Sequence, residues 1–404
     1  MDALTEKYAR LATDNAPGQE GRKDGVSAGL FIGATLPGTP VDFSHGDVDA
    51  FPPPPAATED FVEGLARGAA QAYTEYRGAI DIRETVAGRL AAFTGAPVSA
   101  GNELIITPGT QGALFLAVAA TVGSGTKVAI VQPDYFANRK LVDFFEGTVV
   151  PVQLHYLGDK PGAGLDLQQL EEAFRDGVKV FIFSNPNNPA GVVFDQREIR
   201  SISDLAHRHG VTLIVDQLYS RLRYDAVSYT HLRALREESA NVITIMGPSK
   251  TESLSGYRLG VAFGDAHIIE RMEKLQAIVS LRAGGYSQAV LRGWFSEPQG
   301  WMQERIRLHQ RIRDDLLQLL RRSEGVEART PEAGSYLFPR LPKLRVSTQD
   351  FVRVLRAQAG VTVTPGAEFG PQSLDSVRLN FSQDHAGAVA AAHRMVQLVD
   401  RYRA

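Results

Sequence analysis

The chain has 404 residues, of which 44% are hydrophobic and 22% charged, and this predicts a globular protein of two or three domains. A net charge of −3 argues against nucleic-acid binding, and without a membrane-length apolar run or a secretory signal we expect a cytoplasmic protein that does not contact a membrane. The sequence contains no cysteine, which excludes disulfides, thiolate nucleophiles and cysteine-based metal sites, and we expect no metal.

Residues 1–58 are predicted to form an N-terminal arm. From residue 15 this stretch is rich in glycine and proline and ends in four consecutive prolines at 52–55. Such a composition favours irregular structure, with one short strand at 41–43. We expect the arm to belong to the smaller, C-terminal domain and to act as a lid.

The pattern then changes to alternating helices and strands, which predicts a large domain over residues 59–290. Helices are expected at 58–73 and 82–93, and Asp166 with Gln169 resembles a capping box that opens another. A further helix at 195–209 is closed by Gly210. Short β-branched runs at 103–107, 127–131, 178–184, 211–215 and 242–246 are typical of strands buried on both faces. The fold class expected is α/β, a three-layer α/β/α domain with a mostly parallel sheet.

Residues 291–404 are predicted to form a smaller α+β domain. A long, arginine-rich helix is expected at 301–322, with its arginines on a solvated face. Strands follow at 336–338, 361–364 and 377–381, and helices at 348–359 and 386–401.

Chemically useful groups follow each predicted strand of the large domain. The segments are TPGTQG at 107–112, PDY at 133–135, SNPNNPAG at 184–191, DQLY at 216–219 and GPSK at 247–250, with Arg258 eight residues later. The carboxyl ends of parallel strands meet at one edge of a sheet, so these groups are expected to share a site. A lysine, a carboxylate, an aromatic ring and a helix start with an arginine are what pyridoxal phosphate requires.

The segments NPNNPAG, DQLY and SKTESLSGYRLG resemble those of fold-type I pyridoxal-phosphate enzymes of the class I/II aminotransferase family, over about residues 73–382. The resemblance implies that Lys250 forms the aldimine and carries a 1,3-proton shift, and that Asp216 pairs with the pyridinium nitrogen. Asn188 and Tyr219 would hydrogen-bond the ring oxygen, and Tyr135 would stack on the ring. The phosphate would be held by Gly109, Thr110, Gln111, Ser249 and Arg258. Tyr73 resembles the tyrosine that reaches the neighbouring subunit's phosphate, which implies a homodimer with shared active sites.

The resemblance also implies the substrate contacts. Arg378, on a late strand, would bind the α-carboxylate of an amino acid, together with Asn188. Gly46 resembles the mobile segment that closes over the substrate. The expected reaction moves an amino group between an amino acid and a 2-oxo acid. Further polar contacts are possible at four positions: Arg22, His45, Arg77 and Arg282.

Two departures from the family pattern keep alternatives open. Ala190 stands where the pattern has threonine, and Ser249 beside the lysine is shared with lyase-like branches. A pyridoxal-phosphate-dependent lyase, racemase, decarboxylase or oxidase could use the same cofactor site, since the pocket selects the bond that breaks. A transcription-regulator domain is disfavoured because residues 1–58 are neither basic nor helical enough to bind DNA. The sequence does not name the substrate.

Overall fold

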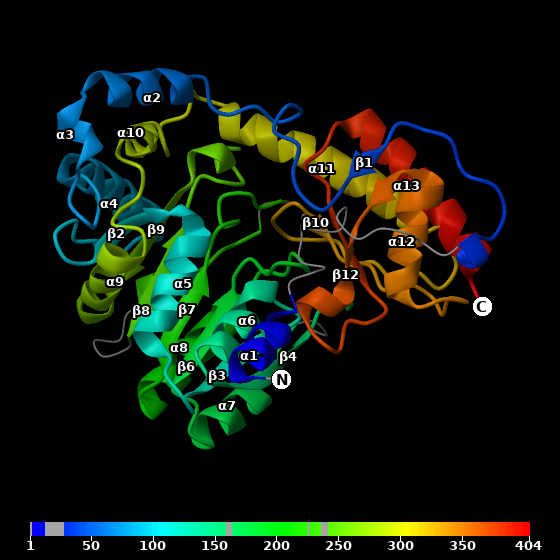
Figure 1. The fold of residues 1–404 in the computed structure, drawn as a ribbon, viewed down its shortest axis with the longest axis horizontal. Coiled ribbons are helices and arrows are strands. Elements are labelled where there is room, and N and C mark those ends of the chain that lie inside the picture. The colour runs from blue at the N-terminus through cyan, green and yellow to red at the C-terminus, as the bar shows by residue number, and fades with distance from the viewer. Residues whose placement is uncertain (1, 13–27, 159–163, 225–226, 236–240) are drawn as a thin grey trace.

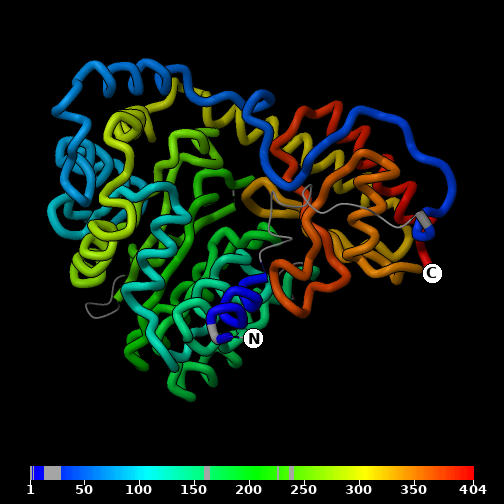
Figure 2. Tube along the Cα trace, viewed as in Figure 1, coloured from blue at the N-terminus to red at the C-terminus, as the bar shows by residue number. Residues whose placement is uncertain are grey.

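The computed structural model describes residues 2–12, 28–158, 164–224, 227–235 and 241–404 (Figure 1). A large sheet covered by helices lies beside a smaller C-terminal part. The long helix α11 (Trp301–Leu320) and the N-terminal arm extend along the outside of the molecule and connect the two parts (Figure 2). Among these residues no helix has the length and apolar character needed to cross a membrane, and no cluster of potential metal ligands occurs.

The large sheet has eight strands in the order β2-β9-β8-β7-β6-β3-β4-β5. They are β2 (Leu104–Pro108), β3 (Lys127–Gln132), β4 (Thr148–His155), β5 (Gly164–Leu165), β6 (Val180–Ser184), β7 (Thr212–Asp216), β8 (Val242–Met246) and β9 (Leu259–Gly264). The run from β8 to β4 is parallel, whereas β9 is antiparallel to both of its neighbours and β5 is antiparallel to β4. All five predicted strands are present, and β4, β5 and β9 are additional.

Helices cover both faces of this sheet. One face packs against α5 (Gly109–Thr121), α6 (Phe136–Phe144) and α9 (Ala266–Val279). The other packs against α7 (Leu167–Arg175) and α8 (Gln196–His209), and α4 (Ile80–Thr94) covers it near β2 and β9. The central strands are buried on both sides, which explains why their sequences are apolar without alternation. The predicted three-layer α/β/α fold is confirmed.

The helix ends follow the local sequence, with one correction. Asp166 caps α7 by accepting a hydrogen bond from the Gln169 N–H at 2.9 Å, but the reciprocal bond is missing because the Gln169 side chain accepts from the Gln153 N–H instead. The prediction of a capping box there is therefore wrong. A complete capping box opens α8, and Gly210 closes that helix in the left-handed conformation.

The predicted helix at 58–73 is also corrected. It divides into α2 (Ala56–Ala66) and α3 (Ala69–Ala72). Gly68 lies between them with φ of +56°, a conformation that ends a right-handed helix. The break leaves Tyr73 at the end of α3 on the surface, where its side chain is 82% exposed.

The C-terminal part has its own core, in which α11, α12 (Thr348–Ala359) and α13 (His385–Tyr402) pack on a small antiparallel sheet. That sheet consists of β10 (Tyr336–Leu337), β13 (Val377–Asn380) and β12 (Thr364–Pro365). The predicted strand at 361–364 is two strands, because β11 (Val361–Thr362) pairs instead with β1 (Val41–Asp42) of the arm. The arm begins with α1 (Ala3–Leu11), which packs on α6, and α10 (Gly285–Gln288) contacts α2.

The prediction that the arginines of α11 form a solvated face is wrong for two of them. Arg305 and Arg313 are buried, at 5% and 2% exposure. Arg305 lies over the ring of Trp301 and Arg313 over that of Tyr224. Arg305 donates to the Thr251 carbonyl of the large part, whereas the later apolar residues of α11 pack in the C-terminal core, so more than one face of this helix is covered.

Candidate active site

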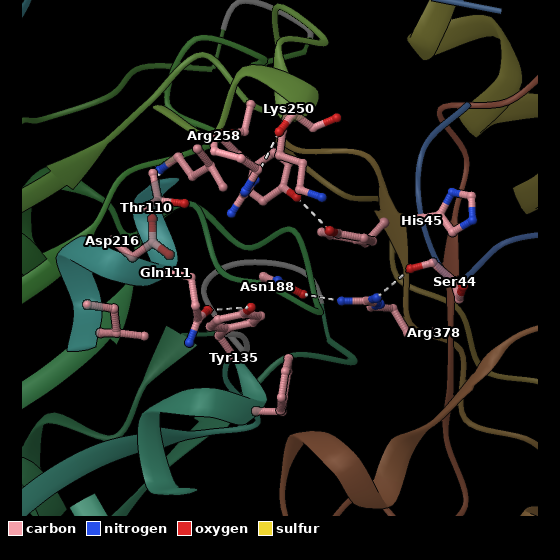
Figure 3. Close-up of a pocket in the computed structure, with 17 residues that line it drawn as sticks. Ser44, His45, Thr110, Gln111, Tyr135, Asn188, Asp216, Lys250, Arg258 and Arg378 are labelled. Atoms are coloured by element: carbon pink, nitrogen blue, oxygen red, sulfur yellow. Dashed lines mark hydrogen bonds between the residues drawn. The ribbon is translucent and has the colours of Figure 1, made fainter. Parts of the chain in front are cut away.

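A cavity opens at the carboxyl edge of the large sheet, facing the C-terminal part (Figure 3). The predicted site residues that line it are Thr110, Gln111, Tyr135, Asn188, Asp216, Tyr219, Ser249, Lys250, Arg258 and Arg378. In Figure 3, Thr110, Asp216 and Arg258 lie across the cavity from His45 and Arg378. The parallel strands bring the first group together, and the C-terminal part supplies Arg378 from the opposite side.

Arg378, on β13, is buried and held in a fixed orientation. Its Nη1 donates to Asn188 Oδ1 at 3.1 Å, and its Nη2 donates to the Ser44 carbonyl at 2.9 Å. The guanidinium lies 4.2 Å from the ring centroid of Tyr336 and 4.8 Å from that of Phe369. Its Nε is buried without a hydrogen-bond partner among the described residues. A planar cation held this way is suited to bidentate binding of a carboxylate.

Asp216 is the last residue of β7 and lies next to Ser184 across the parallel ladder. One of its carboxylate oxygens accepts a hydrogen bond from the Leu218 N–H at 2.9 Å. Burial raises the pKa of Asp216 to about 6, against the opposing effect of that hydrogen bond. A cation brought beside this carboxylate would keep it ionised.

Lys250 follows β8 in a short, closed loop. The Ser253 N–H donates to the Lys250 carbonyl at 3.2 Å, and the Leu254 N–H donates to the Pro248 carbonyl at 3.1 Å. The side chain of Lys250 is exposed to the cavity. Its amine is therefore available to react with a group bound there.

Arg258 lies against the start of α5 and lines the cavity together with Thr110 and Gln111. Gly109 has a φ of +78°, and a Cβ there would lie 2.5 Å from Arg258 Nη2. Gly260 approaches the same turn so closely that a Cβ would lie 2.4 Å from the Thr110 nitrogen. The unpaired N–H groups that begin any helix, with an arginine beside them, are an arrangement that favours a phosphate group.

Tyr135 is placed by groups on both sides. Its hydroxyl donates to Gln111 Oε1 at 2.9 Å. Its backbone N–H donates to Asp134, whose carboxylate also accepts the Ser184 N–H at 2.9 Å and the Ser184 hydroxyl. Burial raises the pKa of Asp134 to about 7 even though these hydrogen bonds oppose the shift. The sequence prediction gave Asp134 no role, although it precedes Tyr135 directly in the strand-end segment.

Tyr336, on β10, lines the cavity and was missed by the sequence prediction. Its hydroxyl lies 2.5 Å from that of Tyr219. Burial raises the pKa of Tyr219 well above its usual value. For Tyr336 burial acts in the same direction, but Arg378 and Lys250 outweigh it and lower the pKa. Either hydroxyl can donate in this pair. Tyr336 could not be found from sequence because no motif surrounds it.

The remaining predicted contacts lie elsewhere or at the margin. Gly46 lines a second chamber that shares Lys250 and His45 with the first. Tyr73 does not line the cavity of its own chain. Of the further polar candidates, Arg77 is paired with Glu273 at 2.6 Å and Arg282 donates to the Thr74 carbonyl, whereas Arg22 lies outside the described residues.

The fold and the cavity together define an enzyme of fold type I, with its site at the carboxyl edge of a mostly parallel sheet. Residues 39–394 match the profile described as aminotransferase class I and II, and the chain belongs to this family. It is an aminotransferase, and the reaction of such enzymes exchanges an amino group between an amino acid and a 2-oxo acid.

Several relatives carry the same activity in their names. A crystal structure described as an aspartate aminotransferase from Rhodobacter sphaeroides is 65% identical, covers 100% of both chains and has a TM-score of 0.94. The putative aminotransferase YugH of Bacillus subtilis is 29% identical over 77% of this chain and 80% of the relative. The aspartate aminotransferase of Sulfurisphaera tokodaii is 27% identical over 81% of this chain and 82% of the relative.

Proposed function

We propose that the cavity binds pyridoxal phosphate and that the chain transfers the amino group of aspartate to a 2-oxo acid. The observation that carries this proposal is the convergence of Lys250, Asp216 and Arg378 on one cavity. Aspartate as the donor follows from the name of the Rhodobacter sphaeroides relative, which is similar over its whole length.

The residues present fit this cofactor. The pKa of Asp216 is raised by burial, and a protonated ring nitrogen beside the carboxylate would lower it again. The turn at Gly109 and Gly260 leaves no room for a Cβ, and Thr110 and Gln111 at the start of α5 line the cavity, where a phosphate could bind. The exposed amine of Lys250 can bond covalently to an aldehyde.

In the proposed mechanism each side chain has one task. The bound cofactor supplies a ring that withdraws electrons from the substrate Cα. Asp216 would hold the proton on the ring nitrogen, and Asn188 and Tyr219 would donate to the ring oxygen. Tyr135 packs on the ring face. Lys250 would take the proton from the substrate Cα and later deliver it to C4′ of the cofactor, the carbon bonded to the substrate nitrogen.

Arg378 orients the substrate by binding its α-carboxylate. That contact sets which bond at the substrate Cα stands perpendicular to the ring, and so favours loss of the proton over loss of carbon dioxide. The Ser44 carbonyl contact ties Arg378 to the arm. We propose that residues 1–58 act with residues 291–404 as a lid over the site, with the pairing of β1 and β11 as support.

We also propose a homodimer. Large apolar side chains are exposed on α2, at Tyr73 and at the end of α9: Val62, Leu65, Tyr73, Ile278, Val279 and Leu281. Arg282 lies 5.0 Å from the ring centroid of Tyr73, so the α9 end and the α3 end adjoin. A second copy covering this surface would bury it and bring Tyr73 to the start of α5 in the partner subunit, where the phosphate is proposed to bind.

The test is the visible spectrum of the purified protein with bound cofactor. Adding aspartate without a 2-oxo acid should convert the visible band to the pyridoxamine form, and Lys250→Ala should abolish the band. If the band recovered without any 2-oxo acid, or if no amino acid converted it, the transaminase assignment would fail.

A further inference from the structure

A buried network of charged side chains includes Glu252, in the loop that carries Lys250. Glu252 follows Lys250 by two residues, and Arg221 follows Tyr219 by two. Arg221 Nη1 donates to Glu252 Oε1, and the two terminal nitrogens of Arg221 bind Glu297 bidentately at 2.8 and 2.8 Å. The exposures of the Arg221, Glu252 and Glu297 side chains are 11%, 1% and 6%. The network therefore joins two loops that each carry a site residue.

The Arg221 side of this network is rigid. Backbone hydrogen bonds from Ser220 to Gln217 at 2.9 Å and from Leu222 to Tyr219 at 3.0 Å close the turn that carries Tyr219. The guanidinium also lies 4.1 Å from the ring centroid of Phe295. A shift of Arg221 would therefore displace the Tyr219 turn.

The loop on the Lys250 side is held from two directions. Arg305 Nη1 donates to the Thr251 carbonyl and to Ser253 Oγ, both at 2.8 Å. Ser253 has a φ of +57°, in the left-handed region that a side chain disfavours. Glu252, between these two residues, fixes the loop through Arg221. Such backbone strain persists only where the surroundings hold it.

We propose that Glu252 and Arg221 are positioning residues, whose ion pair fixes the Lys250 loop relative to the Tyr219 turn. The proposal rests on the function proposed for Lys250. Stability alone does not account for the pair, because well-packed apolar side chains often replace a buried ion pair without loss of stability. Burial raises the pKa of Glu252 to about 6, so the carboxylate is held here against a desolvation cost.

The test compares Glu252→Leu, which removes both the charge and the hydrogen bond, with Glu252→Gln, which keeps an oxygen for Arg221. For the leucine variant we expect kcat to fall by about 10- to 100-fold, the effect of a displacement of about 1 Å, with KM within about threefold. The pH midpoint of the bound cofactor's visible band should move by about 0.5 unit or more. The glutamine variant should lose less than about fivefold in kcat.

Glu103→Leu is the matched control. Glu103 pairs with the buried Arg233 at 2.9 Å, just before β2 and at the opposite end of that strand from the cavity. The Glu103→Leu change should lower the melting temperature while leaving kcat and the spectral midpoint of the holoenzyme unchanged. A Glu252→Leu variant with wild-type kcat and midpoint would overturn the proposal, as would equal losses in the leucine and glutamine variants.

If Glu252→Leu does not fold, Arg221→Lys is tested in its place. A lysine can keep an ion pair with one glutamate, but it cannot bind Glu297 bidentately and also bind Glu252. The same loss of kcat with a moved midpoint supports the proposal, and wild-type values overturn it.

The wild-type spectrum distinguishes failure of this proposal from failure of the proposed function. A wild-type band that Lys250→Ala abolishes, with no effect of the Glu252 variants, rejects only the network. A wild-type protein with no band rejects the proposed function and the network with it.

Discussion

At the scale of single residues, Asp216 shows a conflict between stability and function. Its carboxylate is buried at the end of β7, and its pKa is raised to about 6. The unfolded chain ionises this group near pH 4, so between about pH 4 and 6 the folded cofactor-free protein binds the extra proton. Its contribution to the free energy of unfolding is therefore most favourable below pH 4 and is lost as the pH rises through 6.

Asp216→Asn removes this ionisation and should raise the melting temperature of the cofactor-free protein at pH 7, with the gain vanishing toward pH 4. The same change should lower transaminase activity by more than about 100-fold, because the amide cannot hold the ring nitrogen protonated. Thermal unfolding of both proteins across this range, with steady-state kinetics, checks both parts. An equal melting-temperature difference at all pH values would contradict the assignment of the raised pKa.

At the scale of elements, the two aspartate caps on α7 and α8 differ in completeness. Asp195 accepts from the Glu198 N–H at 2.8 Å, and the Asp195 N–H donates back to Glu198 Oε2 at 2.7 Å. Asp166 makes only the first kind of bond to its helix. Asp195→Ala should lower the free energy of unfolding by about 1–2 kcal/mol and Asp166→Ala by about 0.5–1 kcal/mol.

Urea denaturation of the two variants measures this order, and their kcat should equal that of the wild type because both caps lie away from the cavity. A larger loss for Asp166→Ala would show that the reciprocal bond contributes nothing.

At the scale of the whole molecule, the proposed dimer would complete the site through the exposed apolar surface of α2, Tyr73 and the end of α9. Ile278 is 81% exposed on α9, and its replacement by Asp should leave the folded monomer intact while opposing association. Sedimentation should then show a monomer, and cofactor affinity should fall by about tenfold or more with the loss of the partner's Tyr73. Leu374→Asp, at a 60% exposed position away from this surface, is the control and should remain dimeric. A dimeric, fully active Ile278→Asp protein would place the interface elsewhere.

The sequence by itself determined the alternation of helices with five of the eight strands of the large sheet, and the positions at which chemistry was expected. Lys250 and Asn188 follow buried strands and Asp216 ends one, and parallel strands bring such positions to one edge of the sheet. The additional strands were harder to predict. The start of β9 belongs to the motif SKTESLSGYRLG, which is interpreted from the sequence as a cofactor site and not as a strand, and β4 contains a proline.

Only the tertiary structure decided the contacts between distant segments. Tyr219 meets Tyr336 across 117 residues, and Arg378 meets the Ser44 carbonyl across 334. The burial of Arg305 and the link between Arg221 and Glu252 likewise depend on how α11 and the loops pack. The periodicity of apolar residues indicates which face of a helix or strand is buried, but not which other element covers it. A charged side chain that is buried between two packed elements is therefore predicted from the sequence to lie on the surface.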